Sequence, residues 1–323
     1  MHEPQVACLV TGGAGFIGSS LTRALVAHGH SVRVIDNLST GRRENLRDLA
    51  GRIDFVEADI RDAAACERAV AGVKVVFHTA ALPSVPRSMA DPWTSHDVNV
   101  NGTLRLLQAA RAAGVARMVY SSSSSVYGDT PVLPKVESAE PLPRSPYAAS
   151  KLAGEQYVLA YARGGLIEGV ALRYFNVFGP WQSPEGAYAA VIPLWLQAAL
   201  AGGAATVNGD GSQTRDFTYI DNVVAANRLA AFGPAERVSG WAVNVGAGDR
   251  TSLNDLIALI GEISGRTLAR ETRPARAGDV RDSLAGLDRS RAVLGYEPHI
   301  ALREGLERTW AWTREQSGAT TPA

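Results

Sequence analysis

The sequence is poor in cysteine, and its cysteines and histidines do not cluster. Of 323 residues only two are cysteines, Cys8 and Cys66, and the six histidines are scattered along the chain. A pair this sparse predicts reduced, buried thiols in a cytoplasmic protein and argues against a disulfide framework. The scatter of the histidines leaves no cluster with metal-ligand spacing, so we expect no metal site.

The sequence also lacks long apolar runs and an excess of charge of one sign. No segment reaches the ~18 to 20 apolar residues that a membrane-spanning helix requires. The first residues show no basic stretch followed by an apolar core, so we expect no signal peptide. Lysine plus arginine equals aspartate plus glutamate, 32 of each. This balance argues against a protein that coats nucleic acid or an anionic membrane.

Short runs rich in apolar and β-branched residues alternate with longer amphipathic stretches. The runs predict strands at 6–11, 31–36, 53–57, 73–78, 117–121 and 169–174, and the stretches predict helices at 16–28, 63–71, 102–113 and 146–163. Continuous apolar strands separated by helices indicate a parallel sheet covered on both faces. The expected fold class is therefore α/β, a doubly wound parallel sheet of the Rossmann type.

The composition of the chain changes after residue 176. Prolines and glycines divide the region between 180 and 211 into short pieces, and helices are expected at 192–200 and 252–261. A length of 323 residues suits two unequal lobes better than one. We therefore expect a Rossmann domain over 1–176, to which later segments return, and a smaller C-terminal substrate-binding lobe formed mainly by 177–323.

The first strand runs directly into glycines with a fixed spacing. Gly12, Gly15 and Gly18 follow this strand and open the next helix, and the second strand ends in Asp36. Glycines in this pattern allow a tight turn, close approach of a pyrophosphate to the backbone, and packing of helix on strand, with helix N–H groups directed at the phosphates. Because an acidic residue after the second strand can accept hydrogen bonds from ribose hydroxyls, the pattern predicts a dinucleotide site.

The charge next to this site bears on which dinucleotide binds. A 2′-phosphate beside Asp36 would meet a carboxylate, which favours NAD over NADP. Arg42 and Arg43 are close in sequence and leave NADP open at this stage. The plainer alternatives are a glycine-rich turn without a ligand and an aspartate that only forms a turn before Asn37.

A tyrosine and a lysine stand four residues apart at the start of the expected helix 146–163. This spacing puts Tyr147 and Lys151 on one helical face. The ordinary pKa of tyrosine, about 10, is too high for a base at neutral pH, and we expect the lysine ammonium and the positive nicotinamide to lower it. A surface aromatic beside a solvated lysine is the alternative. Serines at 121–125 end the fifth strand, at the edge where a doubly wound sheet binds its ligands.

Together these motifs resemble the extended short-chain dehydrogenase/reductase family over nearly the whole chain. The resemblance is carried by residues 12–18, 36–41, 59–62, 78–81, 147–151 and 173–180. It implies NAD as the cofactor. The residues that it implies as cofactor contacts are Gly12, Gly15, Phe16, Ile17, Gly18, Asp36, Asn37, Ser39, Thr40, Gly41, Asp59, Ile60, Ala80, Ala81, Asn99, Ser121, Tyr147, Lys151 and Tyr174.

Within this family the residues after the fifth strand distinguish the reactions. Dehydratases and decarboxylases usually carry an acidic residue just before the Val-Tyr-Gly step. Ser124 and Ser125 stand there instead, and serine is no general acid or base at neutral pH. The resemblance therefore implies a UDP-sugar 4-epimerase with Ser123, Tyr147 and Lys151 as its catalytic set. Such an enzyme inverts C4 through a transient 4-keto sugar and enzyme-bound NADH.

The C-terminal half resembles the family's nucleotide-sugar loops. The resemblance assigns Arg215 and Arg276 to the substrate diphosphate, which suits guanidinium forks. Ser283 stands where epimerases restricted to glucose and galactose carry a bulky aromatic. The chain therefore looks closest to the branch that acts on UDP-N-acetylglucosamine, with UDP-glucose as a further substrate, although Pro83 replaces that branch's usual glycine. The expected substrate contacts are Ser84, Arg87, Ser123, Ser124, Tyr147, Asn176, Ala190, Val191, Asn208, Arg215, Arg276, Asp279 and Ser283.

Three alternatives to this function stay open. A UDP-glucuronate 4-epimerase needs a group for the C6 carboxylate; one subgroup uses an arginine where Ser183 stands here, near Trp181, but Arg87 could take that part. An NAD-dependent sugar-nucleotide reductase would share the fold and the Tyr–Lys pair. A non-catalytic NAD-sensing protein would keep the fold alone. The helices at 102–113 and 146–163 resemble a pair that forms a four-helix contact in this family, so we expect a homodimer.

Overall fold

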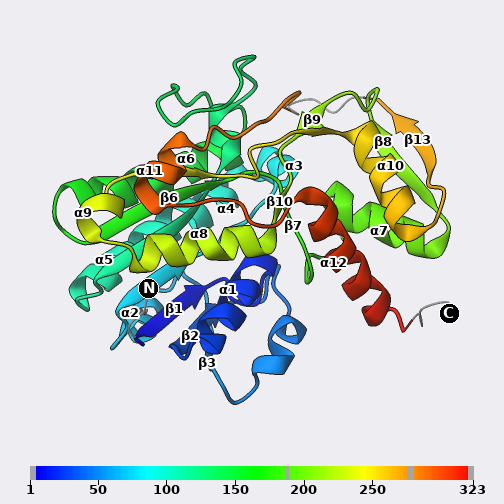
Figure 1. Ribbon diagram of the computed structural model, residues 1–323. Coiled ribbons are helices and arrows are strands. Elements are labelled where there is room, and N and C mark those ends of the chain that lie inside the picture. The colour runs from blue at the N-terminus through cyan, green and yellow to red at the C-terminus, as the bar shows by residue number, and fades with distance from the viewer. Residues whose placement is uncertain (1–4, 186–188, 275–279, 319–323) are drawn as a thin grey trace.

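The structure of the protein is a computed structural model that describes residues 5–185, 189–274 and 280–318. A central sheet, seen in Figure 1, organises it. Its strands are β1 (Ala7–Thr11), β2 (Ser31–Asp36), β3 (Asp54–Glu57), β4 (Val75–His78), β5 (Arg117–Ser123), β6 (Glu168–Tyr174) and β11 (Ala242–Val245). The seven strands lie in the order β11-β6-β5-β4-β1-β2-β3, and every pairing is parallel. The predicted parallel sheet is confirmed.

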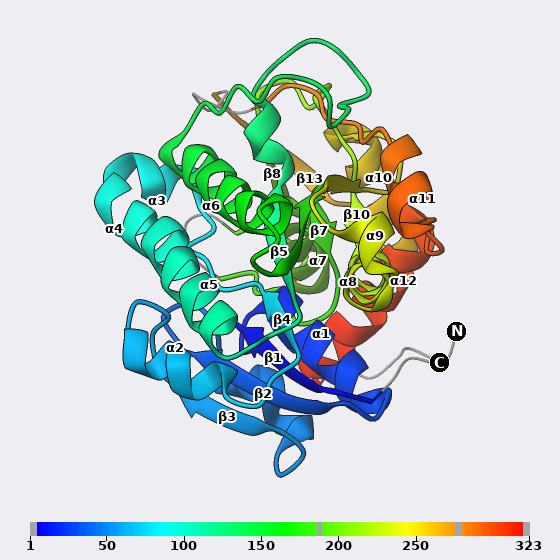
Figure 2. The ribbon, with the colours of Figure 1, turned by 90° about the vertical axis from the view of Figure 1, so that its left-hand side faces the viewer.

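Helices cover both faces of this sheet, as the continuous apolar strands predict. They are α1 (Phe16–Ala27), α2 (Ala63–Val70), α5 (Thr103–Ala112), α6 (Pro146–Arg163) and α8 (Ile220–Phe232). Successive side chains of a strand point to opposite faces. In β1, Val10 belongs to a core shared with α1 and α8, and Leu9 to a core shared with α2, α5 and α6. Figure 2 shows α2 and α5 on one side of the strands and α1 and α8 on the other.

The chain winds outward from the middle of the sheet in both directions. From β1 it proceeds to β2 and β3 on one side, and then from β4 to β5 and β6 on the other. The order therefore reverses between β1 and β4, and a crevice forms at the carboxyl ends of these strands. β11 comes much later in the sequence and pairs with β6, so the C-terminal half returns to the sheet.

The expected elements match the observed ones closely, and the differences have local causes. The bounds of β2 and α6 agree with the expected 31–36 and 146–163. The short strand β11 was not predicted. The expected helix 102–113 is preceded by further turns that were not predicted, α3 (Val85–Ala90), α4 (Pro92–His96) and the π-helical η2 (Asp97–Gly102). Each of these segments is too short to show a periodic apolar pattern.

A second group of elements forms the smaller lobe on the right of Figure 1. It contains α7 (Val191–Ala201), β8 (Ala204–Asn208), α10 (Leu253–Ser264), β13 (Ala269–Arg273) and α12 (Leu302–Gln316). β8 and β13 pair in parallel. Two-residue pairs link this lobe to the sheet: β7 (Val177–Phe178) with β10 (Thr218–Tyr219), and β9 (Thr214–Arg215) with β12 (Thr251–Ser252).

The remaining elements are short. They are η1 (Arg43–Leu49), η3 (Ser124–Tyr127), α9 (Ala235–Val238) and α11 (Asp288–Leu294). Cys8 and Cys66 are buried in the two different cores and form no disulfide with each other. Across the described part of the chain, none of the helices has the length and apolar character needed to cross a membrane.

Candidate active site

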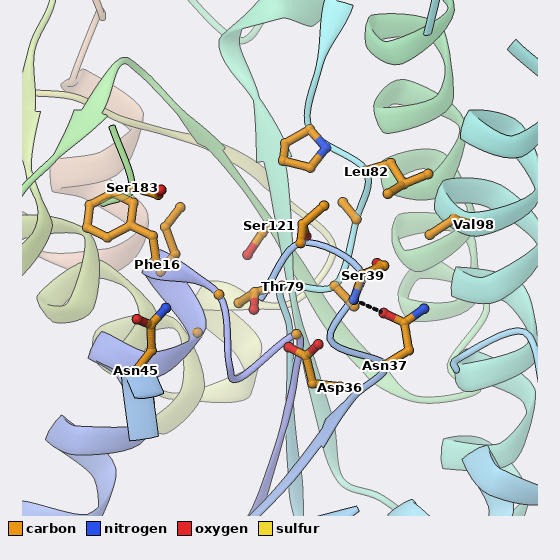
Figure 3. A pocket seen from close by; sticks show the side chains of 18 of the residues that line it. Phe16, Asp36, Asn37, Ser39, Asn45, Thr79, Leu82, Val98, Ser121 and Ser183 are labelled. Carbon is orange, nitrogen blue, oxygen red and sulfur yellow. Dashed lines mark hydrogen bonds between the residues drawn. The ribbon is translucent and has the colours of Figure 1, made fainter. Parts of the chain in front are cut away.

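A cavity of about 460 Å³ opens at the carboxyl ends of the strands, where the sheet order reverses. In Figure 3, Asp36 and Asn37 lie at one end of it, Ser121 near its middle, and Phe16 and Leu82 on opposite sides. Many of the expected contacts line this one cavity. They are Gly12, Gly15, Phe16, Ile17, Gly18, Asp36, Asn37, Ser39, Thr40, Asp59, Ile60, Ala80, Ala81, Ser121, Tyr147, Lys151, Tyr174 and Ala190.

The glycine turn between β1 and α1 has no room for side chains. Gly12 has a φ of +67°, and a Cβ there would lie 2.7 Å from the Cα of Ala80. A Cβ on Gly18 would lie 2.2 Å from the carbonyl oxygen of Gly12. Gly15 is the N-cap of α1. The turn therefore brings bare backbone and the free N–H groups of a helix terminus to the cavity wall, which suits a phosphate group.

Asp36 ends β2 and turns its carboxylate toward this same turn. Its two oxygens accept hydrogen bonds from the backbone N–H groups of Ala14 (2.9 Å) and Leu38 (2.8 Å). Burial raises the pKa of this carboxyl group, and the two backbone hydrogen bonds oppose that rise. Each oxygen accepts one of these bonds, so lone pairs remain for hydroxyl donors on the cavity side.

The two arginines that left NADP open in the sequence are engaged elsewhere. Arg42 forms an ion pair with Glu185. Arg43 forms an ion pair with Glu57 at 2.5 Å, and its guanidinium lies 4.3 Å from the centre of the Phe55 ring. Both cations therefore already have carboxylate partners, and the negative Asp36 decides the charge at the end of β2. The geometry favours NAD over its 2′-phosphorylated form.

The far end of the cavity is ordered by a carboxylate after β3. Asp59 accepts hydrogen bonds from Asn37 Nδ2 (2.7 Å) and Arg61 Nη2 (2.8 Å). The Arg61 side-chain hydrogen bond is the largest contribution that lowers the pKa of Asp59. The paired Asp59 fixes Asn37 beside Ile60, and all three line the cavity where an adenine would lie.

Two expected cofactor contacts lie behind the cavity wall. A Cβ on Gly41 would lie 2.9 Å from Asp36 Oδ2, so Gly41 packs against the back of that carboxylate. Asn99 is buried, and its amide group binds the Leu82 N–H (2.8 Å) and the Ser150 hydroxyl (2.9 Å). Neither residue is among those that line the cavity, and their expected contact with the cofactor stays a prediction.

The capping of α6 places the tyrosine–lysine pair at the cavity. Ser145 is the N-cap and accepts a hydrogen bond from the Ala148 N–H at 3.1 Å, and Pro146 occupies the first helical position. Tyr147 and Lys151 then lie one turn apart, and both line the cavity. The Lys151 Nζ is 4.3 Å from the centre of the Tyr120 ring on β5. The expected juxtaposition of phenol, ammonium and glycine turn is present.

The surroundings of the phenol act on its pKa in two directions. Burial raises the pKa of Tyr147, and a side-chain hydrogen bond with Ser123 acts in the opposite direction. Burial also lowers the pKa of Lys151 to about 7. The expected lowering of the Tyr147 pKa concerns Lys151 together with a bound nicotinamide, and it stays a prediction.

The serines at the end of β5 point to different partners. Ser123 Oγ lies 2.9 Å from Ser125 Oγ and accepts a hydrogen bond from the Ser125 N–H at 3.2 Å. It is also bonded to the Tyr147 phenol. Ser124 begins η3, and neither Ser123 nor Ser124 is among the residues that line the two cavities. Ser123 is connected to the first cavity through Tyr147, which lines it, and the expected substrate contacts of both serines stay predictions.

A second cavity of about 270 Å³ adjoins the first on the side of the smaller lobe. The two share Val177, Ala189 and Ala190 as lining residues, so they form one continuous crevice. The expected substrate contacts that line the second cavity are Asn176, Ala190, Val191, Asn208 and Arg215. Sequence reasoning therefore found one group of residues at each end of the crevice.

Arg215 holds its position through backbone acceptors. Its Nη1 donates to the carbonyl oxygens of Thr214 (2.9 Å) and Arg281 (2.8 Å). These bonds use one corner of the guanidinium. Arg215 also lines the second cavity, and a guanidinium fork suits the oxygens of a diphosphate.

A buried carboxylate next to Arg215 ties the surrounding loops together. Asp216 accepts hydrogen bonds from the N–H groups of Ala247 (2.7 Å), Gly248 (3.1 Å) and Ala285 (3.0 Å). It is fully buried, and burial raises its pKa to about 6. Three loops of the substrate half thus meet at one side chain, a role that sequence reasoning missed.

The other expected substrate contacts lie outside the two cavity walls. Ser84 caps α3 by accepting a hydrogen bond from the N–H of Arg87 (3.1 Å), and the Arg87 side chain is exposed. Ser283 is buried behind Asn176, with its Oγ 3.5 Å from the amide oxygen. It therefore acts on the cavity only through Asn176. Arg276 and Asp279 lie outside the described residues.

Several lining residues were not predicted. Among them are Asn45, Leu82, Val98 and Gln182 in the first cavity and Thr206, Gln213 and Phe217 in the second. They come from loops, from the short helical turns η1 and η2 and from the strand β8, none of which carries a motif at these positions, so the sequence held no signal for them. A different kind of signal was overlooked for Glu155 and Arg173, which are charged residues within otherwise apolar elements.

Comparison with known families agrees with this geometry. A model described as the NAD dependent epimerase/dehydratase family matches residues 8–246. The chain is 44% identical over 313 residues to a protein named UDP-glucose 4-epimerase from Mycolicibacterium smegmatis, and the alignment covers 96% of this chain and 99% of that relative.

Solved structures give similar agreement over the full fold. UDP-N-acetylglucosamine 4-epimerase from Methanobrevibacter ruminantium, in complex with UDP-N-acetylmuramic acid, has a TM-score of 0.90 and 36% identity, covering 97% of this chain and 99% of that one. MoeE5 in complex with UDP-glucuronic acid and NAD has a TM-score of 0.87 and 35% identity, covering 96% and 99%. These relatives share the architecture but differ in the sugar that their names carry.

Proposed function

Because the chain belongs to the NAD dependent epimerase/dehydratase family, we propose that it is a UDP-sugar 4-epimerase whose main substrates are UDP-N-acetylglucosamine and UDP-N-acetylgalactosamine. UDP-glucose and UDP-galactose are further substrates in this proposal. One observation carries it: Tyr147 and Lys151 line the same crevice as the glycine turn and Asp36, and this crevice continues to Arg215.

The cofactor is NAD, and the first cavity fits it. The glycine turn keeps side chains away from the start of α1, where the first N–H groups of the helix can bind a pyrophosphate. Asp36 retains lone pairs for ribose hydroxyls, and Asn37 and Ile60 line the adenine end. When bound, NAD supplies reversible two-electron oxidation of the C4 alcohol.

The chain's own residues handle the proton and the orientation of the sugar. Tyr147 takes the proton of the 4-hydroxyl and returns it after the sugar has turned. Ser123 bridges the phenol and the sugar oxygen, which its hydrogen bond with Tyr147 supports. Lys151 holds the nicotinamide ribose and adds a positive charge that favours the phenolate. In the second cavity Arg215 holds the diphosphate while the sugar presents either face.

The serines after β5 favour epimerisation over water loss or decarboxylation. Ser124 and Ser125 form the start of η3 and carry no acid or base that works at neutral pH. A plain NAD(P)-dependent reductase would share Tyr147 and Lys151 but would need no diphosphate arginine such as Arg215, whereas a sugar-nucleotide reductase is distinguished by its need for added NADH. A protein that only senses NAD would need neither the Tyr147–Lys151 pair nor Arg215. The combination at the two ends of the crevice supports the epimerase.

The proposed preference for N-acetylated sugars rests on Ser283. This small side chain is buried against Asn176, which lines the second cavity. A bulky residue there would push Asn176 into the cavity and reduce the space for a 2-acetamido group. UDP-glucuronate is the competing substrate. Ser183 and Trp181 line the first cavity, and Ser183 stands where one glucuronate subgroup carries an arginine, so a C6 carboxylate lacks that partner here.

We also propose that the protein is a homodimer built on α5 and α6. Tyr157 on α6 is exposed, and Trp93 on the neighbouring α4 is 83% exposed. Exposed aromatic side chains on adjacent helices are typical of a surface that a partner covers. Light scattering coupled to gel filtration measures the mass directly.

The substrate assay tests the proposed function. Purified protein is incubated without added NADH with UDP-glucose, UDP-N-acetylglucosamine or UDP-glucuronate, and the products are separated by chromatography. The cofactor released on denaturation is measured in parallel. We expect bound NAD and the highest kcat/KM for the N-acetylated pair. Conversion that requires added NADH would contradict the epimerase, and a preference for UDP-glucuronate would overturn the proposed sugar.

A further inference from the structure

An ion pair is buried directly beneath the catalytic residues. Glu155 on α6 and Arg173 on β6 form two hydrogen bonds, Nη2 to Oε1 at 2.6 Å and Nε to Oε2 at 3.0 Å. Their side chains are 0% and 4% exposed. The hydroxyl of Ser122 donates to Glu155 Oε2 at 2.6 Å. One carboxylate thus joins the helix α6 to the ends of both β5 and β6.

This arrangement is not explained by stability. Removing two charges from water costs several kcal/mol per ion, and a well-packed apolar pair often does as well or better. Arg173 Nη1 is buried without a hydrogen-bond partner, and the guanidinium lies 4.8 Å from the centre of the Tyr127 ring. An ion pair in the core whose hydrogen-bonding groups are not all paired points to a function in the adjacent site, which contains Tyr147 and Lys151.

The ion pair lies next to the lysine that the reaction needs. Glu155 follows Lys151 by four residues on α6, so the two side chains share one face of the helix. Lys151 is buried, which lowers its pKa to about 7, and Glu155 is the charge that acts in the opposite direction. Without a neighbouring anion, a buried ammonium in this position would lose its proton more readily.

Few other groups can influence this ammonium. In the described part of the chain, the titratable groups of opposing strands that face Lys151 are the Tyr120 ring on β5 and His78 on β4. Burial lowers the pKa of His78 to about 3, so this ring is neutral at physiological pH. Burial raises the pKa of Tyr120, which is therefore also neutral. On α6 itself, Tyr147 and Glu155 flank the lysine, and Arg173 on β6 is bound to Glu155.

We propose that Glu155, held by Arg173 and Ser122, is a positioning residue that keeps Lys151 in its ammonium form and holds the serine strand in register with Tyr147. The inference rests on the proposed function, in which Lys151 supports the phenol. Ser122 is adjacent to Ser123, so the bond from Ser122 to Glu155 also fixes the backbone that presents the bridging hydroxyl.

The same two strands supply a matched control at their other end. Arg117 begins β5 and Glu168 begins β6, and they form an ion pair at 2.6 Å. Arg117 is buried and also donates to backbone carbonyls at the C-terminal end of α8. This pair links the same strands but lies at their amino ends, away from the crevice. Glu168→Gln therefore removes an equivalent cross-strand contact without touching the site.

The charge of Lys151 can be measured without relying on turnover. The lysines of this chain are Lys74, Lys135 and Lys151. Competitive acetylation with acetic anhydride, followed by mass spectrometry of the peptides, gives the pH at which each amine becomes half-reactive. In Glu155→Gln we expect that pH to fall by about one unit for Lys151 and to stay unchanged for Lys74.

Turnover gives a second readout on the same variants. Loss of the anion favours neutral Lys151, so the alkaline limb of kcat against pH should move to lower pH in Glu155→Gln, with KM for the UDP-sugar little changed. Glu168→Gln should lower Tm but leave both the amine titration and the pH profile in place. A merely structural role for Glu155 predicts the same result for the two variants.

The outcomes separate this proposal from the proposed function. If the folded Glu155→Gln protein keeps the wild-type titration of Lys151, or if Glu168→Gln shifts it equally, the proposal is overturned. Should the single variant fail to fold, Glu155→Gln with Arg173→Met replaces the ion pair by a neutral pair, and the half-reactive pH of Lys151 should fall by less than in the single variant, because a cation is removed together with the anion. Wild-type protein that epimerises no UDP-sugar refutes the proposed function, while the amine titration still tests Glu155.

Discussion

The cofactor half and the substrate half of the crevice are built in different ways. The cofactor half is made of strand ends and a glycine turn, where a single methyl group at Gly18 would approach the Gly12 carbonyl to 2.2 Å. The substrate half is made of loops and two-residue strands, which meet at the buried carboxylate of Asp216. Backbone packing fixes the first half, and one side chain with its hydrogen bonds organises the second.

This difference indicates how the two halves divide the work. Backbone contacts in the glycine turn tolerate no change, so the cofactor half offers the same chemistry to any sugar. Loops anchored at Asp216 can change their outer residues without losing their anchor. We therefore expect substitutions in the cofactor half to affect all sugars alike, and substitutions in the substrate half to affect affinity and sugar choice.

The largest expected effect tests the cofactor half. Tyr147→Phe removes the hydroxyl that transfers the proton, so kcat should fall by about 10² to 10⁴-fold for every UDP-sugar. Circular dichroism and the content of bound NAD should stay as in the wild type. A loss confined to one sugar would break the comparison, and full activity would contradict the role of the phenol.

The next effect tests the substrate half. Arg215→Ala removes charge-assisted hydrogen bonds to the diphosphate, each worth about 1.5 to 3 kcal/mol, so KM should rise by about 10 to 100-fold. Bound NAD should not change. Arg303→Ala, which breaks an exposed ion pair with Glu262, is the control and should leave KM as it is. A large loss of NAD in Arg215→Ala would show that the halves are not separate.

A change of size sharpens the comparison within the substrate half. Ser283→Tyr forces bulk against Asn176, which should lower kcat/KM for UDP-N-acetylglucosamine about tenfold and affect UDP-glucose less. Ser283→Ala keeps the small volume and should retain the wild-type preference. Equal losses of kcat/KM for UDP-N-acetylglucosamine, UDP-glucose and UDP-glucuronate would show that Ser283 does not set the size of the sugar that fits.

The smallest effect concerns retention of the cofactor. Asp36→Asn keeps the shape of the side chain but removes the charge beside the ribose, so the fraction of protein purified with NAD should fall, with about a three- to tenfold weaker affinity. Asp54→Asn alters an exposed carboxylate on the next strand and serves as the control. Calorimetric titration gives the affinities of the wild type and the variant for NAD and NADP. If the ratio of the two affinities is the same in both proteins, Asp36 does not determine the choice between the cofactors.

The sequence predicts the cofactor half better than the substrate half, for a physical reason. Its motifs are local: Gly12 to Gly18, Asp36, and the pair Tyr147 and Lys151 each need only their own strand or helix to take their places. The substrate half depends on contacts between distant segments. Asp216 bonds to Ala285, 69 residues away, and no local pattern announces such a contact.

Burial is the property that sequence reasoning estimated least well. Asn99 and Gly41 belong to segments that border the first cavity, but neither is among the residues that line it. The expected fall in the pKa of Tyr147 left out the cost of removing the phenol from water, and burial raises this pKa. The role of Glu155 was overlooked because its partner, Arg173, lies on another element, although a charge inside an apolar strand is itself a signal.

The residues at the boundary between the two cavities determine how strongly the protein can bind the sugar ring. Val177, Ala189 and Ala190 are shared by both walls, and their side chains offer neither a donor nor an acceptor. A hexose that is held by its diphosphate can therefore rotate past these three side chains without breaking hydrogen bonds to them. The same side chains cannot distinguish one sugar from another by hydrogen bonds. Selection among sugars at this boundary therefore depends on the shape of the cavity.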